Sequence, residues 1–160
     1  MSADGPRVET QFTLRPARPV EAEGLAYARL MDEVTEGFLR FRLGRNAVEI
    51  LARAYLQPAH DLSYEHVTFA EAEQRIVGMA SGYAATARRS FSDRPLKLAA
   101  GGRAWRLRAT GVLLWPLLRI LETIADGDFY VLAAIVAADM RGGGLGSLLL
   151  DHMEERARSS

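Results

Sequence analysis

The chain has 160 residues, which is enough for one domain with a sizeable hydrophobic core. Twenty basic and twenty acidic residues give a formal net charge of zero, which argues against a nucleic-acid partner or an anionic membrane held by overall charge. The absence of cysteine excludes disulfides, thiolate metal sites and a cysteine nucleophile, and it fits a cytoplasmic protein. We expect no signal peptide, no transmembrane helix and no metal site.

The first part of the chain predicts a lead-in, a strand and a helix. Residues 1–11 are polar and are expected to be disordered. Residues 12–16 alternate apolar and polar side chains and stop at a proline, which is typical of a short edge strand. A helix is expected from Pro19, with breaks at Gly37 and Gly44. Its apolar face carries Tyr27, Leu30, Met31, Val34 and Phe38.

A second helix and a hairpin are predicted next. Asn46 stands where it could cap this helix, Glu49 completes a capping-box spacing, and Pro58 ends the helix. Residues 64–71 and 76–83 predict two strands, and their short polar connection favours an antiparallel pair.

Residues 85–124 interrupt this simple pattern and predict a helical insertion. The segment is basic as far as Arg108 and apolar from Val112 to Ile124, so we expect a loop followed by a helix kinked at Pro116. Two interpretations remain. The favoured one is an insertion that packs over the core with its arginines in solvent, and the other is an interfacial helix that binds a membrane surface or a partner.

The last part of the chain predicts a strand, a glycine loop and a helix. Residues 129–137 form a continuous apolar run, which is typical of a central strand buried on both faces. Three glycines follow Arg141, and a helix begins near Leu145. Glycines let a ligand approach the backbone, and the first amides of a helix attract an anion, so this loop predicts a phosphate site. Ser147 stands where a P-loop has lysine and where the dinucleotide fingerprint has glycine, which argues against both motifs.

The spacing Arg141, Gly144 and Gly146 resembles the pyrophosphate loop of the GNAT family of N-acetyltransferases. The order of predicted elements over residues 12–158 is similar to that family, apart from the insertion. The resemblance implies an α/β (mixed α+β) fold, with a mostly antiparallel central sheet flanked by helices. It also implies a single acetyltransferase-like domain at 12–160, with the helical insertion at about 85–124.

The resemblance also implies a binding role for particular residues, with acetyl-CoA as cosubstrate and no metal. The backbone at the end of the long strand would pair with the pantetheine arm, the loop amides would hold the pyrophosphate, and Arg141 would orient the loop or touch phosphate. These cofactor-binding residues would be Ala134, Ile135, Val136, Arg141, Gly142, Gly143, Gly144, Leu145, Gly146 and Ser147. The family often has an acid and a proline after the strand, whereas this chain has Ala137 and Ala138.

In the family, the chain normally continues after the loop's helix with a strand, a helix bearing a tyrosine acid, and a final strand pair. We therefore expect the domain to be truncated after this helix. Three explanations stay open: the sequence is a fragment, a partner chain or second copy completes the sheet, or the protein binds a ligand without catalysis.

The expected function is transfer of an acetyl group from acetyl-CoA to a primary amine, on a small molecule or a peptide. The alternative is a non-catalytic acyl-CoA-binding domain, or a truncated remnant that a partner chain completes. No general base is evident, so we assign no catalytic residue. Glu33, Glu36 and Phe38 are weak candidates for the acceptor side, and His66 and His152 are weaker still.

Overall fold

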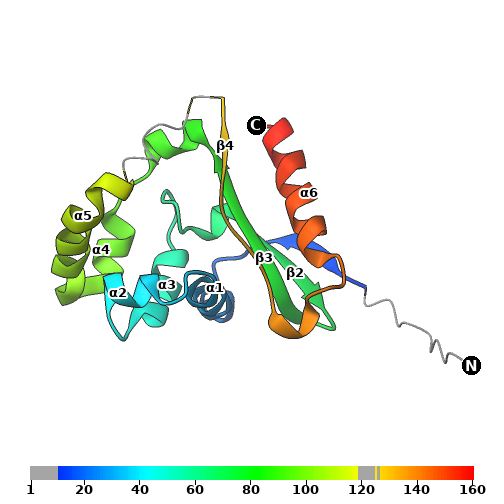
Figure 1. Cartoon of the computed structure of the whole chain (residues 1–160), viewed down its shortest axis with the longest axis horizontal. Coiled ribbons are helices and arrows are strands. Elements are labelled where there is room, and N and C mark those ends of the chain that lie inside the picture. The colour runs from blue at the N-terminus through cyan, green and yellow to red at the C-terminus, as the bar shows by residue number, and fades with distance from the viewer. Residues whose placement is uncertain (1–10, 119–124, 126) are drawn as a thin grey trace, which may run out of the picture.

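The computed structural model describes residues 11–118, 125 and 127–160 of the chain, so the predicted disorder of residues 1–10 lies outside it. Its centre is a four-stranded antiparallel sheet in the order β1-β2-β3-β4 (Figure 1). The strands are β1 (Thr13–Pro16), β2 (Val67–Ala72), β3 (Arg75–Ala84) and β4 (Phe129–Val136). The predicted edge strand and the predicted hairpin are both confirmed, since β1 lies at one edge and β2 pairs with β3.

One face of the sheet is covered by helices from the N-terminal half. These are α1 (Glu21–Val34) and α3 (Ala47–Tyr55), and α2 (Phe38–Leu43) packs beside them. Tyr27 of α1 and Tyr55 of α3 stack with ring centroids 5.0 Å apart, and Tyr55 also meets Phe69 of β2. The predicted breaks at Gly37 and Gly44 are confirmed, because both adopt positive φ (86° and 83°) on either side of α2.

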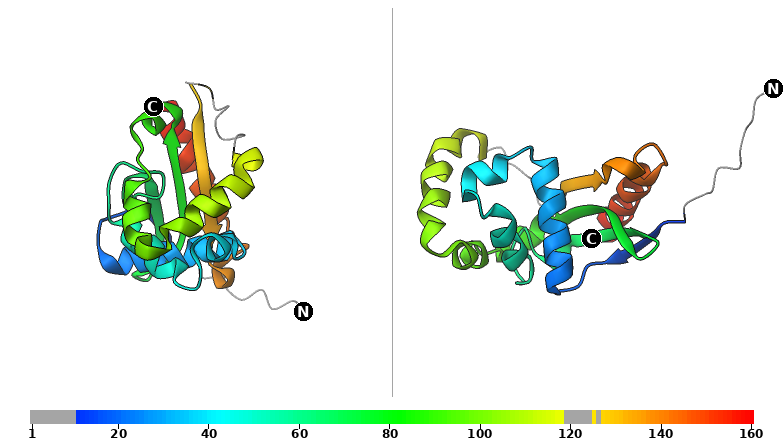
Figure 2. Two further views of the ribbon diagram at one scale, coloured as in Figure 1. Left: turned by 90° about the vertical axis from the view of Figure 1, so that its left-hand side faces the viewer. Right: turned by 90° about the horizontal axis from the view of Figure 1, so that it is seen from below.

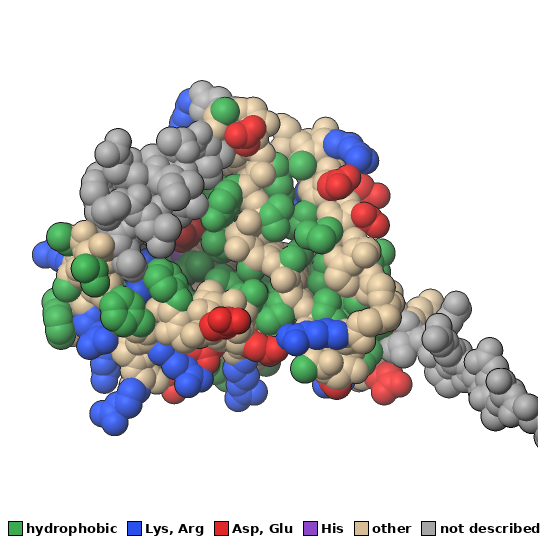
Figure 3. All heavy atoms as spheres, viewed as in Figure 1, with side chains coloured by type: hydrophobic (Ala, Val, Ile, Leu, Met, Phe, Trp, Pro, Cys, Tyr) green, Lys and Arg blue, Asp and Glu red, His purple; other side chains and the backbone are tan. Residues whose placement is uncertain are grey.

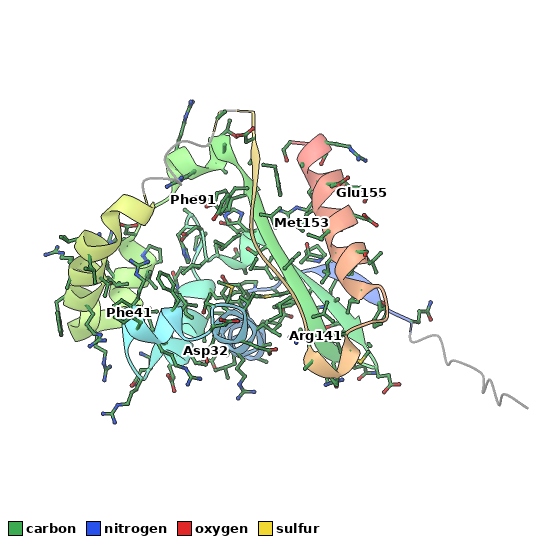
Figure 4. All side chains as sticks on the ribbon, viewed as in Figure 1. Asp32, Phe41, Phe91, Arg141, Met153 and Glu155 are labelled. Carbon is green, nitrogen blue, oxygen red and sulfur yellow. The ribbon has the colours of Figure 1, made fainter. Side chains whose placement is uncertain are left out.

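The other face of the sheet is covered by α6 (Leu145–Arg158) alone among the described helices. Leu145, Leu149 and Met153 of α6 pack against small residues of the sheet such as Ala70 and Ala80. Figure 4 shows Met153 on the sheet side of α6 and Glu155 on the opposite side. This packing holds the first turn of α6 against the end of β4, where the glycine loop lies.

The insertion forms a helical arm beside α2 and α3. It contains η2 (Ala85–Ser90), α4 (Arg94–Ala100), η3 (Gly101–Arg103) and α5 (Ala104–Leu118). Ala100 and Leu107 join the core cluster formed with α1 and α3. The right-hand view of Figure 2 places α5 on the side of the molecule remote from α6.

The prediction of a loop from residue 85 to Arg108 is therefore wrong, because α4 and the start of α5 lie in this segment. A proline in the first turn of α4 favours a helix start, and the basic side chains of this segment are compatible with a helix. Pro116 lies inside α5, and residues 119–124 of the predicted helix lie outside the described residues.

Two further expectations in the N-terminal half are wrong. Residues 64–66 form the short helix η1 (Tyr64–His66) ahead of β2, so His66 does not lie on a strand face. Asn46 precedes α3 but makes no side-chain capping bond. Its φ of −96° and ψ of 24° lie outside the extended region from which a capping side chain reaches the first turn.

The prediction of a central strand buried on both faces is also wrong, because β4 lies at the edge of the described sheet. Val131 is 41% exposed, and only Ala133 and Ile135 of this strand are buried. An apolar run indicates that the two faces of a strand are covered. It does not indicate whether the strand has a neighbour on each side, because that depends on the strand order of the whole sheet.

Candidate functional site

The free edge of β4 presents backbone hydrogen-bonding groups at its carboxyl end. The amide of Ala137 donates to the carbonyl of Val77 at 2.8 Å, in register with the pairs Met79↔Ile135 and Gly78↔Val136. Antiparallel pairing alternates along a strand, so Ile135 turns its N–H and C=O toward β3. By the same alternation, Ala134 and Val136 direct theirs away from β3, toward the free edge. Of the three strand residues predicted to bind, two therefore offer backbone groups there.

A bulge interrupts the pairing just before this stretch. The register between β3 and β4 shifts between Ser81, which faces Ala133, and Gly82, which faces Val131, so Leu132 is the extra residue. Bulges bend a strand and raise its local twist. A Cβ at Gly82 would lie 2.7 Å from a ring carbon of Phe129 and 2.9 Å from the Tyr130 carbonyl, so the close approach of the strands requires glycine.

The glycine loop joins β4 to α6 through two left-handed residues. Gly142 has φ of 85° and Gly144 has φ of 81°, a region that side chains rarely adopt. A Cβ at either position would meet no atom within 4 Å among the described residues, so the space in front of both is open. Gly143 and Gly146 do not have positive φ, so the backbone conformation does not require glycine at these two positions.

The backbone amides of this loop have no acceptor within the part of the chain that the structure describes. The first helical bond of α6 runs from the Leu148 amide to the Gly144 carbonyl at 3.1 Å. The amides of residues 142–147 consequently stay free, and no side chain caps the helix. The first turn of α6 carries no acidic residue, so the positive end of its dipole is not neutralised locally. This arrangement suits an anion.

Arg141 ties the loop to the strand and to α1. Its Nε donates to the Val136 carbonyl at 3.0 Å, and its terminal nitrogen lies 2.8 Å from a carboxylate oxygen of Glu33. Figure 4 shows Arg141 beside the end of β4, near α1. The Arg141 side chain remains 57% exposed and that of Glu33 47% exposed. Arg141 thus orients the loop while staying accessible to a ligand.

A second ion pair fixes the short helix η5 (Ala138–Met140) that leads into the loop. Arg75 of β3 donates to Asp139 at 2.7 Å. This hydrogen bond is the main cause that lowers the pKa of Asp139 below its usual value. The negative charges of Asp139 and Glu33 are therefore each balanced by an arginine, so neither carboxylate strongly repels an anion at the loop.

Most of the other candidate site residues lie apart from the glycine loop. Among the acceptor-side candidates, only Glu33 makes a described contact with the loop. Glu36 is exposed in the turn before α2, and Phe38 is the exposed first residue of α2. His66 is half-buried between Tyr83 and Phe91, and desolvation lowers its pKa. His152 lies on α6 without a described hydrogen-bond partner.

Sequence reasoning missed the pairing of Arg141 with Glu33, because the two residues are 108 positions apart and no local pattern links them. Within residues 11–118, 125 and 127–160, no helix has the length and apolar content to cross a bilayer. In the same residues no group of three or more His, Cys, Asp or Glu side chains is arranged for a metal ion.

A family model and two solved structures are similar to this chain. The family model for the acetyltransferase (GNAT) family matches residues 30–160. No curated protein sequence matches the chain. One solved structure, described as an acetyltransferase, is similar with a TM-score of 0.65 and 21% identity, covering 92% of this chain and 75% of that one. Another, an N-acetyltransferase from Staphylococcus aureus Mu50, has a TM-score of 0.62 and 16% identity, covering 90% and 75%.

At these identities the two solved structures show the fold, a mixed α/β architecture with an antiparallel sheet flanked by helices. The family model spans most of the chain and includes the whole glycine loop. The resemblance inferred from Arg141, Gly144 and Gly146 is thereby confirmed, and the chain belongs to the acetyltransferase (GNAT) family.

Proposed function

We propose that this chain transfers an acetyl group from acetyl-CoA to a primary amine. The observation that carries the proposal is the run of free amides from Gly142 to Ser147, which opens α6 beside the free edge of β4. Family membership supports acyl transfer in general. The choice of acetyl-CoA and of an amine acceptor is our inference from the site.

The loop fits a pyrophosphate group by charge, space and hydrogen bonding. A diphosphate offers several acceptor oxygens, and the six amides of residues 142–147 have no other acceptor among the described residues. The open space in front of Gly142 and Gly144 would let phosphate oxygens reach the backbone. Arg141 would add guanidinium N–H donors that its pairing with Glu33 leaves exposed, while its bond to Val136 keeps the loop in place.

The free edge of β4 fits an extended arm with amide groups. In this proposal the pantetheine arm lies along Ala134 and Val136 and pairs with their outward N–H and C=O groups, as an added strand would. The Val136 carbonyl already accepts from Arg141, so it has one remaining lone pair for the arm. Ile135 would not take part through its backbone, since it pairs with Met79.

When bound, acetyl-CoA supplies the thioester that an amine attacks directly. The outward N–H groups near Val136 would polarise the thioester carbonyl. An alkyl amine with a pKa near ~10.4 must first lose a proton. Glu33 is the predicted acid nearest the loop, yet its carboxylate is paired with Arg141, so we assign it to positioning Arg141 and name no general base.

The proposal is tested by incubating the full chain with acetyl-CoA and a panel of primary amines while free thiol is measured. We expect thiol release that depends on at least one amine and is lost in Gly144→Asp. Binding of acetyl-CoA without any turnover would instead support the non-catalytic acyl-CoA-binding alternative. A folded chain that does not bind acetyl-CoA at all would refute both functions.

A further inference from the structure

A hollow lined by arginines lies on the α2 and α5 side of the molecule, away from the glycine loop. It has a volume of about 620 Å³, and its lining residues are Arg40, Gly44, Arg45, Asn46, Arg103 and Arg106. Figure 3 shows Lys and Arg side chains gathered on this side, at the lower left. The glycine loop opens α6 on the other side of α1 (Figure 1), so the two sites are separate.

The arginines of this hollow carry more positive charge than the described residues balance. Arg40 is paired with Asp32, with its Nε 2.8 Å from the carboxylate. Arg45 and Arg103 are exposed and have no acidic partner among the described residues. None of the lining residues is acidic. Positive charges gathered in a concave surface raise the local concentration of anions.

The guanidinium of Arg106 has N–H groups without a hydrogen-bond acceptor among the described residues. One terminal nitrogen donates to the Phe41 carbonyl at 3.1 Å, and the guanidinium carbon lies 5.8 Å from the centre of the Trp105 ring. Its Nε is buried and has no hydrogen-bond partner within the described part of the chain. Arg106 as a whole is only partly buried, and its contacts with Phe41 and Trp105 hold the guanidinium in place, so a ligand oxygen could bind its remaining terminal N–H groups at a lower ordering cost than at a free arginine.

The segment between α2 and α3 forms part of the same hollow. Gly44, Arg45 and Asn46 lead directly into the nine-residue helix α3, and the Asn46 side chain does not cap it. The first turn of α3 carries Glu49, which offsets the positive end of the helix dipole, so the arginines rather than the helix supply the positive charge of the hollow.

We propose that this hollow binds a small polyanion carrying two or more phosphate or carboxylate groups. The guanidinium group holds either anion through two parallel hydrogen bonds, which explains a site made of arginines. A volume of about 620 Å³ suits a small molecule rather than an extended polymer. This inference does not depend on the proposed acetyltransferase activity, since it uses none of the residues of the glycine loop.

The test is calorimetric titration of the full chain at low ionic strength with inorganic triphosphate and, separately, with citrate. Binding of triphosphate alone would identify a phosphate ligand, and binding of citrate alone a carboxylate ligand. Because triphosphate could also enter the glycine loop, each titration is repeated with Gly144→Asp. We expect one binding event per chain that Gly144→Asp retains and that weakens as salt is added.

The variants separate a built site from general attraction. Arg45→Gln combined with Arg103→Gln should weaken binding by about tenfold or more, the effect of losing one or two charge-assisted hydrogen bonds. Arg29→Gln is the matched control, because Arg29 is an exposed arginine on α1 without a described partner. Absence of binding by both anions, loss in Gly144→Asp, or equal weakening in Arg29→Gln would each overturn the proposal.

Discussion

Gly144→Asp tests the glycine loop most directly, because the substitution adds a charge with little steric cost. Gly144 has φ of 81°, and a Cβ there would meet nothing within 4 Å. The left-handed backbone costs a side chain about 1–2 kcal/mol, and aspartate tolerates this region better than most residues. We therefore expect the variant to fold and its effect to fall on the ligand.

The magnitude follows from Coulomb's law. A carboxylate about 5 Å from a diphosphate with about two negative charges is repelled by about 1.7 kcal/mol in a medium like water. With an effective dielectric constant of ~20 the repulsion rises to about 6.6 kcal/mol. The smaller value already weakens binding by about 15-fold, since each ~1.4 kcal/mol is a factor of ten.

The assay is calorimetric titration with acetyl-CoA, with thermal melts to confirm that each variant is folded. Gly144→Ala carries the backbone strain without the charge, so the affinity ratio between the alanine and aspartate variants isolates the electrostatic effect. Gly101→Asp is a second control, because Gly101 also has positive φ (53°) and open space, but lies in the insertion. Equal affinities of folded Gly144→Ala and Gly144→Asp would refute a phosphate site at this loop.

Three further predictions concern the residues that support the site. Arg141→Leu should weaken acetyl-CoA binding about tenfold, because it removes both side-chain bonds of Arg141. Glu33→Gln removes one exposed ion pair and should change the free energy of unfolding by less than about 1 kcal/mol. Titration measures the binding and melting curves the stability, and equal effects of the two variants on binding would contradict the orienting role of Arg141. Leu149→Ala removes a fully buried side chain between α6 and the sheet and should lower the free energy of unfolding by about 2–5 kcal/mol, measured by urea denaturation; a loss below ~1 kcal/mol would be inconsistent with this packing. Burial raises the pKa of Glu23, but hydrogen bonds from Arg18 and Arg15 outweigh it and lower the pKa overall. The stabilisation from Glu23 is then present above the unfolded pKa of about 4.3 and lost as pH falls, so Glu23→Gln should cost about 2–3 kcal/mol near neutral pH and progressively less in acid. A pH-independent difference between the two denaturation curves would argue against this assignment.

The glycine loop was accessible from sequence because its signal is local. Gly142 and Gly144 adopt conformations that favour glycine, and the order of strand, loop and helix needs only neighbouring residues. The hairpin of β2 and β3 was predictable for the same reason. The helix α4 was missed although Pro95 in its first turn is a helix-start signal, since the surrounding arginines suggested a solvated loop.

The capping of α3 and the position of His66 depended on backbone angles that residue type alone does not specify. Asn46 is a favoured capping residue, yet its ψ of 24° keeps the side chain from the first turn. His66 falls in η1 rather than in β2, because strand pairing with β3 begins only at Val67. In both cases the tertiary structure overrode a local preference.

By itself, the sequence determined the order of the main elements, the conformation of the glycine loop and the family. Only the tertiary structure decided that β4 lies at an edge of the described sheet, that Ala134 and Val136 rather than Ile135 turn their backbone outward, and that Glu33 holds Arg141. Strand order, register and ion pairs between distant segments depend on contacts across the whole sheet. A stretch of sequence carries the conformational preferences of its own residues but not the identity of the segment that will pack beside it.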